Sequence, residues 1–170
     1  DNDFTVGQIK FPGTGGGGIA TNALTTPNNS TLTITGKGVT QPVQLSMNNQ
    51  TVAFNCNIIF DSTEGQDENC RFNAGQQSIT FGQGYSLTVN DELTFSSLVL
   101  TNQLNFNGTI LGNGNLKFGA KSKAVFGSTY SSGSFTDNIV AAGSNNVTLI
   151  SNAATIKANI TVSDSNTFTF

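Results

Sequence analysis

One short pattern recurs along this chain: an apolar residue, a polar residue, then phenylalanine. It occurs as QIKF at 8–11, SITF at 78–81, ELTF at 92–95, QLNF at 103–106, NLKF at 115–118 and TFTF at 167–170, with TLTI at 31–34 and SLTV at 86–89 as close variants. In a β-strand, residues two apart share a face. The pattern therefore predicts short strands that each point two apolar side chains inward and a polar one outward. On this basis Phe95, Phe106 and Phe118 are interior residues, and Thr94, Asn105 and Lys117 face outward.

The spacing of the repeats favours a β-solenoid. Phe81, Phe95, Phe106 and Phe118 follow one another at intervals of 11 to 14 residues, so two units make about 25 residues, within the usual length of a solenoid coil. A parallel β-helix would stack these phenylalanines into an internal ladder. An antiparallel sandwich or jelly roll is the alternative, since it also has short strands at regular intervals. A sandwich, however, has no reason to repeat one residue pattern.

We assign the whole chain, 1–170, to one all-β domain. No stretch sustains a 3.6-residue apolar period, and Gly or Asn interrupts almost every ten residues. Residues 1–30 form an irregular, Gly- and Asn-rich N-terminal region, and 31–170 carry the repeated short strands. A length of 170 residues suits one domain with a real core.

The composition argues against several partners. Charged residues make up 10% of the chain, against about 25% in ordinary soluble proteins. With seven Lys and Arg and a net charge of −3, the chain is poorly suited to nucleic acid or an anionic membrane. It has no run of apolar residues long enough to insert into a bilayer as a helix. The N-terminus lacks a basic and then apolar leader, so we expect any signal peptide to have been removed.

The two cysteines predict a disulfide. In VAFNCNIIF at 52–60, Cys56 shares the buried face with four apolar residues, and Cys70 is two residues before Phe72. A bond between Cys56 and Cys70 would stabilise the fold by roughly 3 kcal/mol. It would also indicate an oxidising compartment, and thus an extracellular or cell-surface protein. Two buried free thiols are the alternative.

Candidate chemistry is sparse. Four acids, Asp61, Glu64, Asp67 and Glu68, lie in one stretch between the cysteines and offer a weak calcium site. Their spacing does not match an EF-hand, and a solvated loop is the simpler interpretation. The chain has no histidine, which excludes the serine–histidine hydrolases and the usual zinc sites. Carbohydrate-active enzymes need only two acids, but most of the acids here are scattered or confined to this loop. We expect no catalytic residues, no enzyme activity and no cofactor.

One segment resembles a known family. The phrase LNFNGTILGNGNLKFG, which begins at residue 104, is similar to the repeats of autotransporter passenger domains, and the likeness extends over 78–106 and more weakly over 134–170. Those passengers are right-handed β-helices displayed on bacterial outer surfaces. The resemblance implies a surface-exposed adhesin or coat module with no catalytic residues to carry over.

These observations lead to two main functional expectations. The first is an extracellular surface-display or adhesin module that contacts other proteins or ligands on host or cell surfaces. The second is a self-assembling subunit of a surface fibre or layer, a homo-polymer in which the strands FTVGQIKF and NTFTF add to neighbouring copies. An ice-binding solenoid is a further alternative because rows of Thr can order water, although a T-x-T pattern is evident only at TLTIT and TFTF.

Overall fold

The structure, a computed structural model, describes most of the chain. The described residues are 3–6, 9–11, 20–26, 30–35, 44–47, 50–61, 69–73, 78–90, 92–96, 103–119, 122–135, 138–141, 147–162 and 166–170. They form strands and connecting turns, and none of them belongs to a helix that could cross a membrane.

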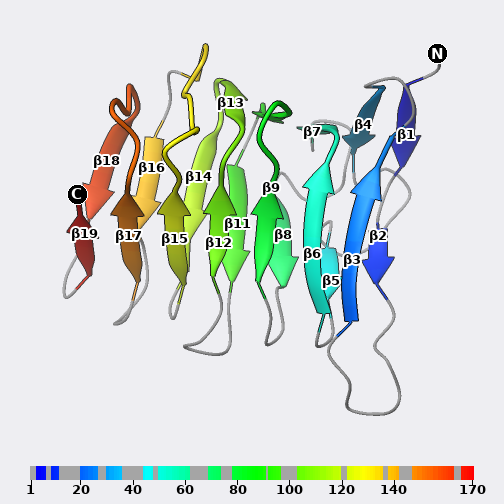
Figure 1. The fold of residues 1–170 in the computed structure, drawn as a ribbon, viewed down its shortest axis with the longest axis horizontal. Coiled ribbons are helices and arrows are strands. Elements are labelled where there is room, and N and C mark those ends of the chain that lie inside the picture. The colour runs from blue at the N-terminus through cyan, green and yellow to red at the C-terminus, as the bar shows by residue number, and fades with distance from the viewer. Residues whose placement is uncertain are drawn as a thin grey trace.

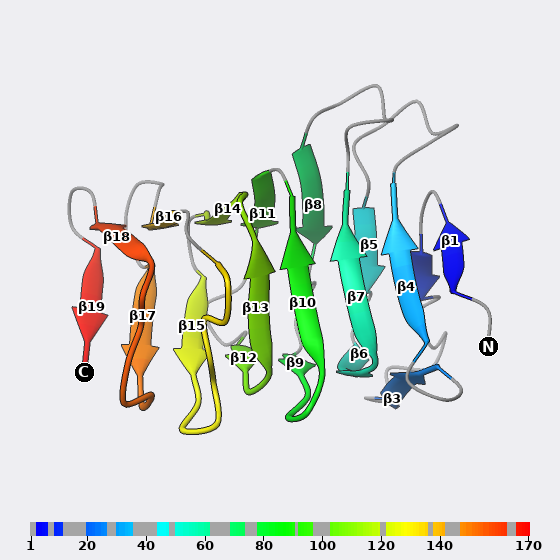
Figure 2. The same ribbon diagram turned by 90° about the horizontal axis from the view of Figure 1, so that it is seen from above.

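The strands form three sheets, which we name A, B and C, and the strands of each sheet follow one another along the long axis of the molecule (Figures 1 and 2). Sheet A contains β1 (Phe4–Val6), β4 (Thr31–Ile34), β7 (Asn57–Phe60), β10 (Ser86–Val89) and β13 (Thr109–Gly112). Sheet B contains β2 (Ile9–Phe11), β5 (Gln44–Met47), β8 (Asn69–Asn73), β11 (Glu92–Ser96), β14 (Asn115–Phe118), β16 (Asn138–Ala141) and β18 (Asn159–Val162). Sheet C contains β3 (Ala20–Thr25), β6 (Gln50–Asn55), β9 (Ile79–Phe81), β12 (Leu104–Phe106), β15 (Lys123–Phe126), β17 (Thr148–Ser151) and β19 (Thr167–Thr169).

The chain is a β-solenoid. From β1 to β15 it visits sheets A, B and C in turn, and the described strands β16 to β19 then alternate between sheets B and C. Parallel pairing joins the strands of neighbouring coils. The length of a coil is close to the predicted one: Phe95 is in register with Phe118, and Phe81 with Phe106. Parallel pairing throughout confirms the solenoid and excludes the antiparallel sandwich.

Strands also occur before residue 31. Within 1–30, which we expected to be irregular, β1, β2 and β3 pair in register with β4, β5 and β6. The repeating coil therefore already includes these segments.

A ladder of phenylalanines runs through the core beneath sheet C. Phe54, Phe81, Phe106 and Phe126 come from successive coils and stack nearly face to face, with ring centroids 5.4, 5.1 and 5.2 Å apart. All four are almost fully buried. In-register stacking of parallel coils places like on like, so one repeated residue gives a continuous aromatic column.

A second aromatic stack lies beneath sheet B. Phe95 and Phe118 stack at 5.2 Å, and each meets the first ladder edge to face: Phe95 lies 5.7 Å from Phe106, and Phe118 lies 6.4 Å from Phe126. Both offset-stacked and edge-to-face geometries are favourable for aromatic pairs. The prediction that Phe95, Phe106 and Phe118 are interior is confirmed.

The alternation VAFNCNIIF is not one strand. Val52, Phe54, Cys56, Ile58 and Phe60 are all buried, as predicted. The backbone nevertheless bends at Cys56, so that β6 belongs to sheet C and β7 to sheet A. The inward face continues around the corner while the strands change sheets.

Asparagine and glycine alternate at the corner that follows sheet C. Gly82 follows Asn55 one coil on, and Gly127 follows Asn107. Two backbone hydrogen bonds show this alignment: Gly82 N–H donates to the Phe54 carbonyl, and Gly127 N–H donates to the Phe106 carbonyl. The Asn55 side-chain oxygen lies 2.5 Å from where a Cβ would stand at Gly82, and the Asn107 oxygen occupies the same place at Gly127. The missing Cβ of one coil thus makes room for the amide of the coil before it.

Candidate functional site: the outward face of sheet A

The predicted disulfide is wrong. Cys56 is a free thiol, 2% exposed, and burial raises the pKa of this thiol to about 11. It lies at the bend between sheets C and A, whereas Cys70 belongs to β8 in sheet B, in register with Leu93. Two residues can both follow the inward pattern of a solenoid and still lie on different sides of its coil. The Cys70 side chain lies outside the described residues.

The predicted calcium ligands are not brought together by any described contact. Asp61 follows β7, and its backbone N–H donates to the Ile34 carbonyl at 3.1 Å. Glu64, Asp67 and Glu68 lie outside the described residues. The described part of the chain contains no group of three metal-ligating side chains.

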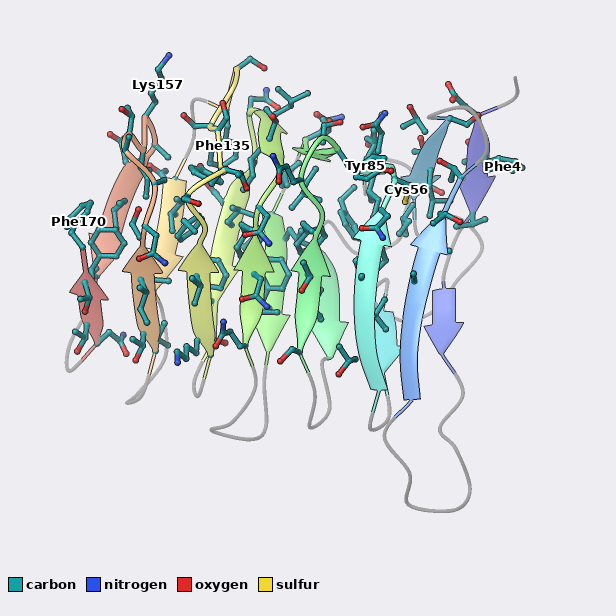
Figure 3. The ribbon with its side chains drawn as sticks, viewed as in Figure 1. Phe4, Cys56, Tyr85, Phe135, Lys157 and Phe170 are labelled. Atoms are coloured by element: carbon teal, nitrogen blue, oxygen red, sulfur yellow. The ribbon has the colours of Figure 1, made fainter. Side chains whose placement is uncertain are left out.

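A small cavity lies next to Cys56. Its volume is about 10 Å³, and its lining includes Phe54, Cys56, Phe81 and Tyr85; Figure 3 shows Cys56 and Tyr85 on the same side of the stack. A space of this size is at the lower limit for one water molecule. It cannot hold a substrate.

Charged side chains mark the outer face of sheet B. Lys117 Nζ lies 3.3 Å from Glu92 Oε1 across neighbouring coils, and the Thr94 hydroxyl donates to the same carboxylate at 3.2 Å. The pair is partly exposed, so it contributes no more than about 1 kcal/mol. Thr94, Asn105 and Lys117 are half-buried and lie on the outer side of their strands, as predicted.

Sheet A presents a different outer surface, which faces the viewer in Figure 2. Parallel register aligns its outward side chains into two columns. We call the first the entry column; it contains Asp3, Thr31, Asn57, Ser86, Thr109 and Ser131. We call the second the central column; it contains Thr5, Thr33, Ile59, Thr88 and Leu111.

The buried partners of these columns explain why the face points outward. In β4, β7 and β10 the burial alternates strictly, and Leu32, Ile58 and Leu87 are 6% exposed or less. A shift of one residue would expose this apolar set and bury the columns. The hydrophobic core therefore fixes the orientation of the face.

Side chains of the entry column tie successive coils together. Asp3 Oδ1 accepts the backbone N–H of Thr31 at 2.7 Å, and Asn57 Oδ1 accepts that of Ser86 at 2.9 Å. The Ser86 hydroxyl donates to the same Asn57 oxygen at 3.1 Å. These bonds satisfy backbone donors at the start of the strand and hold the coils in register.

The face ends at β13. Gly112 has a φ of 103°, and its position leaves no room for a Cβ against the Val89 backbone carbonyl. Beyond it, a Cβ added at Gly133 would stand 2.6 Å from Leu111 and 2.7 Å from Thr109. The turn at Gly133 therefore lies against Thr109 and Leu111 of β13, and the accessible face extends over β1, β4, β7 and β10.

The central column carries no charge. It offers hydroxyl and aliphatic groups only, and none of the hydrogen bonds among the described residues involves the hydroxyl of Thr33 or Thr88. Neighbouring strands of a sheet are about 4.8 Å apart, and residues two apart on a strand are separated by about 6.6 Å. The two columns thus form a grid of groups that are uncharged except for Asp3 at its edge.

Only part of this grid could be predicted from the sequence. The sequence TLTI shows two threonines on one face of a strand, whereas SLTV and NIIF do not have threonine at both outward positions. The members of the grid become aligned only when the register Thr33–Ile59–Thr88 is known. Comparison with protein-family models, with curated proteins and with solved structures gave no match to this chain.

Proposed function

We propose that this chain is an extracellular surface-display or adhesin module that binds through an extended face rather than in a pocket. The observation that carries the proposal is the outward face of sheet A, where two columns of small side chains repeat from coil to coil. A surface of this kind suits a ligand that is itself extended, because each successive strand of sheet A can add a weak contact.

The cell-surface location rests on the passenger-domain resemblance and on the low charge of the chain, 10%. Because Cys56 is a free thiol, a disulfide no longer supports an oxidising compartment for this protein. The proposed partners are ligands on host or cell surfaces, or other protein subunits.

Adhesion can be measured with beads that carry the purified chain. We expect the beads to adhere to at least one solid biological surface, such as bacterial cells, animal cells or polysaccharide particles, or to ice. Thr88→Lys, in the central column, should weaken adhesion because a charged side chain then stands in the face. Thr80→Lys is the matched control, since Thr80 is a half-buried outward residue of β9 in sheet C. Beads that adhere to none of these surfaces would overturn the proposal.

A self-assembling subunit is the second candidate, and the exposure of apolar side chains in the end coils favours it. Phe4 is 44% exposed, Val162 38% and Phe170 84%, and Phe4 and Phe170 lie at opposite ends of the stack (Figure 3). Among the described strands, those at the sheet edges pair on one side only: β1, β2 and β3 at one end of the stack, β18 and β19 at the other, and β13 where sheet A ends. A strand of a second copy could extend these sheets by β-strand addition.

Assembly is tested by measuring the mass of the particles in solution as a function of concentration. A self-assembling chain forms dimers or filaments as concentration rises, and Val162→Lys should shift the monomer–oligomer equilibrium toward monomer. A chain that stays monomeric at all concentrations would rule out this candidate.

A further inference from the structure

The outward face of sheet A differs from the other two in its chemistry. The central column reads Thr5, Thr33, Ile59, Thr88 and Leu111, all uncharged and most of them β-branched. On sheet B the corresponding surface carries the Glu92–Lys117 pair. On sheet C the corresponding column is also uncharged, but it has one hydroxyl, one amide and three aliphatic side chains: Thr80, Asn105, Ala53, Val125 and Ile150.

The members of the central column have little freedom to move. Each of β4, β7 and β10 is hydrogen-bonded to a strand on both sides and rests on the buried core. Thr and Ile are stiff at χ1 because they branch at Cβ. The positions of their methyl and hydroxyl groups are therefore set by the backbone lattice rather than chosen among rotamers.

A rigid grid of this type favours an ordered layer of water. The methyl groups of Ile59 and its neighbours leave water little choice of orientation, while the hydroxyls of Thr33 and Thr88 are left to bond water within the described structure. Charged groups would instead hold individual hydration shells, and the central column has none. The strand spacing of about 4.8 Å is also close to the repeat of oxygen atoms along one axis of hexagonal ice.

From this lattice of hydroxyl and methyl groups we infer that the outward face of sheet A binds the surface of ice. The inference rests on the proposed function and specifies its ligand: the extended surface is crystalline water. A polysaccharide surface is the less suitable ligand because the entry and central columns contain no aromatic side chain on which a sugar ring could stack.

The test follows the growth of a single ice crystal in a supercooled solution of the purified chain. The wild-type protein should shape the crystal and hold its growth until the solution is cooled further, which gives a measurable gap between melting and growth temperatures. Thr88→Lys and Thr33→Lys should lose this gap, because each places a charged chain in the central column. Thr80→Lys, on sheet C, should retain it.

Two further variants keep the test independent of folding. Thr88→Val keeps the shape of the side chain and its methyl group but removes the hydroxyl, and Thr88→Ser keeps the hydroxyl but removes the methyl group. Both should reduce the gap between the melting and growth temperatures of ice without changing the thermal unfolding temperature of the protein substantially. Ice that grows in wild-type protein as it does in buffer would overturn the inference, and so would an equal gap in wild type, Thr33→Lys and Thr88→Lys. If beads carrying the chain adhere to cells while ice grows freely, the ice inference fails and the adhesin proposal stands. If the beads adhere to no surface, both fail.

Discussion

Phe81 and Phe106 stack with ring centroids 5.1 Å apart and an interplanar angle of 10°, although they are 25 positions apart in the sequence. Their strands, β9 and β12, are in register from Leu104–Ile79 to Phe106–Phe81. One internal column thus joins successive coils through their side chains as well as through their backbone.

Truncation of the ladder should destabilise the fold strongly. Phe106 is 1% exposed and packs between two stacked rings and two edge-on rings. We expect Phe106→Ala to lower the free energy of unfolding by about 3–5 kcal/mol, the range for a buried aromatic residue. The control is Lys117→Ala, which removes a partly exposed ion pair and should cost less than about 1 kcal/mol. Equal losses in urea-denaturation experiments would mean that the inward register is wrong.

Gly112 should be intolerant of any side chain. Its φ of 103° is unfavourable for other residues, and an added Cβ would overlap the backbone of Val89, which cannot rotate away. Gly112→Ala should therefore cost about 1–3 kcal/mol or more. Gly84→Ala is the comparison, since Gly84 also has positive φ but open space around it; a smaller loss there separates the overlap from the backbone strain. Similar losses in both variants would contradict the proposed overlap.

The Asn–Gly alternation predicts a rescue. Gly127→Ala should destabilise the fold because its Cβ would meet the Asn107 side chain. Asn107→Ala in the same molecule removes that side chain, so the double variant should be more stable than the two single losses predict. A coupling of about 0.5–3 kcal/mol is expected for residues in direct contact. Strict additivity in a double-mutant cycle would show that the two residues do not compete for space.

Cys56 should be protected in the folded chain and reactive when the chain unfolds. In a Cys70→Ser background, alkylation at pH 8 without reductant should be slow in buffer and rapid in denaturant, since burial raises the pKa of the Cys56 thiol from 9.0 to about 11. Because the pKa is raised in the folded state, the Cys56 thiol of the unfolded chain loses its proton at a lower pH than the thiol of the folded chain. The contribution of this group to stability is therefore fully present below pH 9 and declines as pH rises toward 11. Rapid alkylation of the native protein would contradict the burial of this thiol.

Much of the fold could be predicted from the alternation alone. ELTF, QLNF and NLKF became strands with their phenylalanines inside, because two-residue periodicity fixes which side chains are buried. The assignment of strands to sheets could not be predicted, since it depends on where the backbone turns. At Cys56 the alternation continues unbroken through a corner, and this is why the parity of Cys56 and Cys70 wrongly suggested a disulfide.

The candidate face was harder to foresee for a related reason. Thr33, Ile59 and Thr88 share a column, but the spacing between Thr33 and Ile59 differs from that between Ile59 and Thr88 because the intervening turns differ in length. A sequence repeat of fixed period would have aligned them. Only backbone register reveals which outward residues are neighbours.

The register of sheet A is tested most directly by engineered disulfides in a chain that carries Cys56→Ala and Cys70→Ala. Ile59→Cys with Thr88→Cys places thiols on adjacent strands in register, where Cα atoms about 4.8 Å apart can be bridged. Thr33→Cys with Thr88→Cys is the control, because β7 separates the two strands and a gap of about 9.6 Å cannot be closed. Mass spectrometry of the oxidised monomers should show a bond in the first pair and two free thiols in the second. A bond in the second pair, or none in the first, would contradict the column and the face built on it.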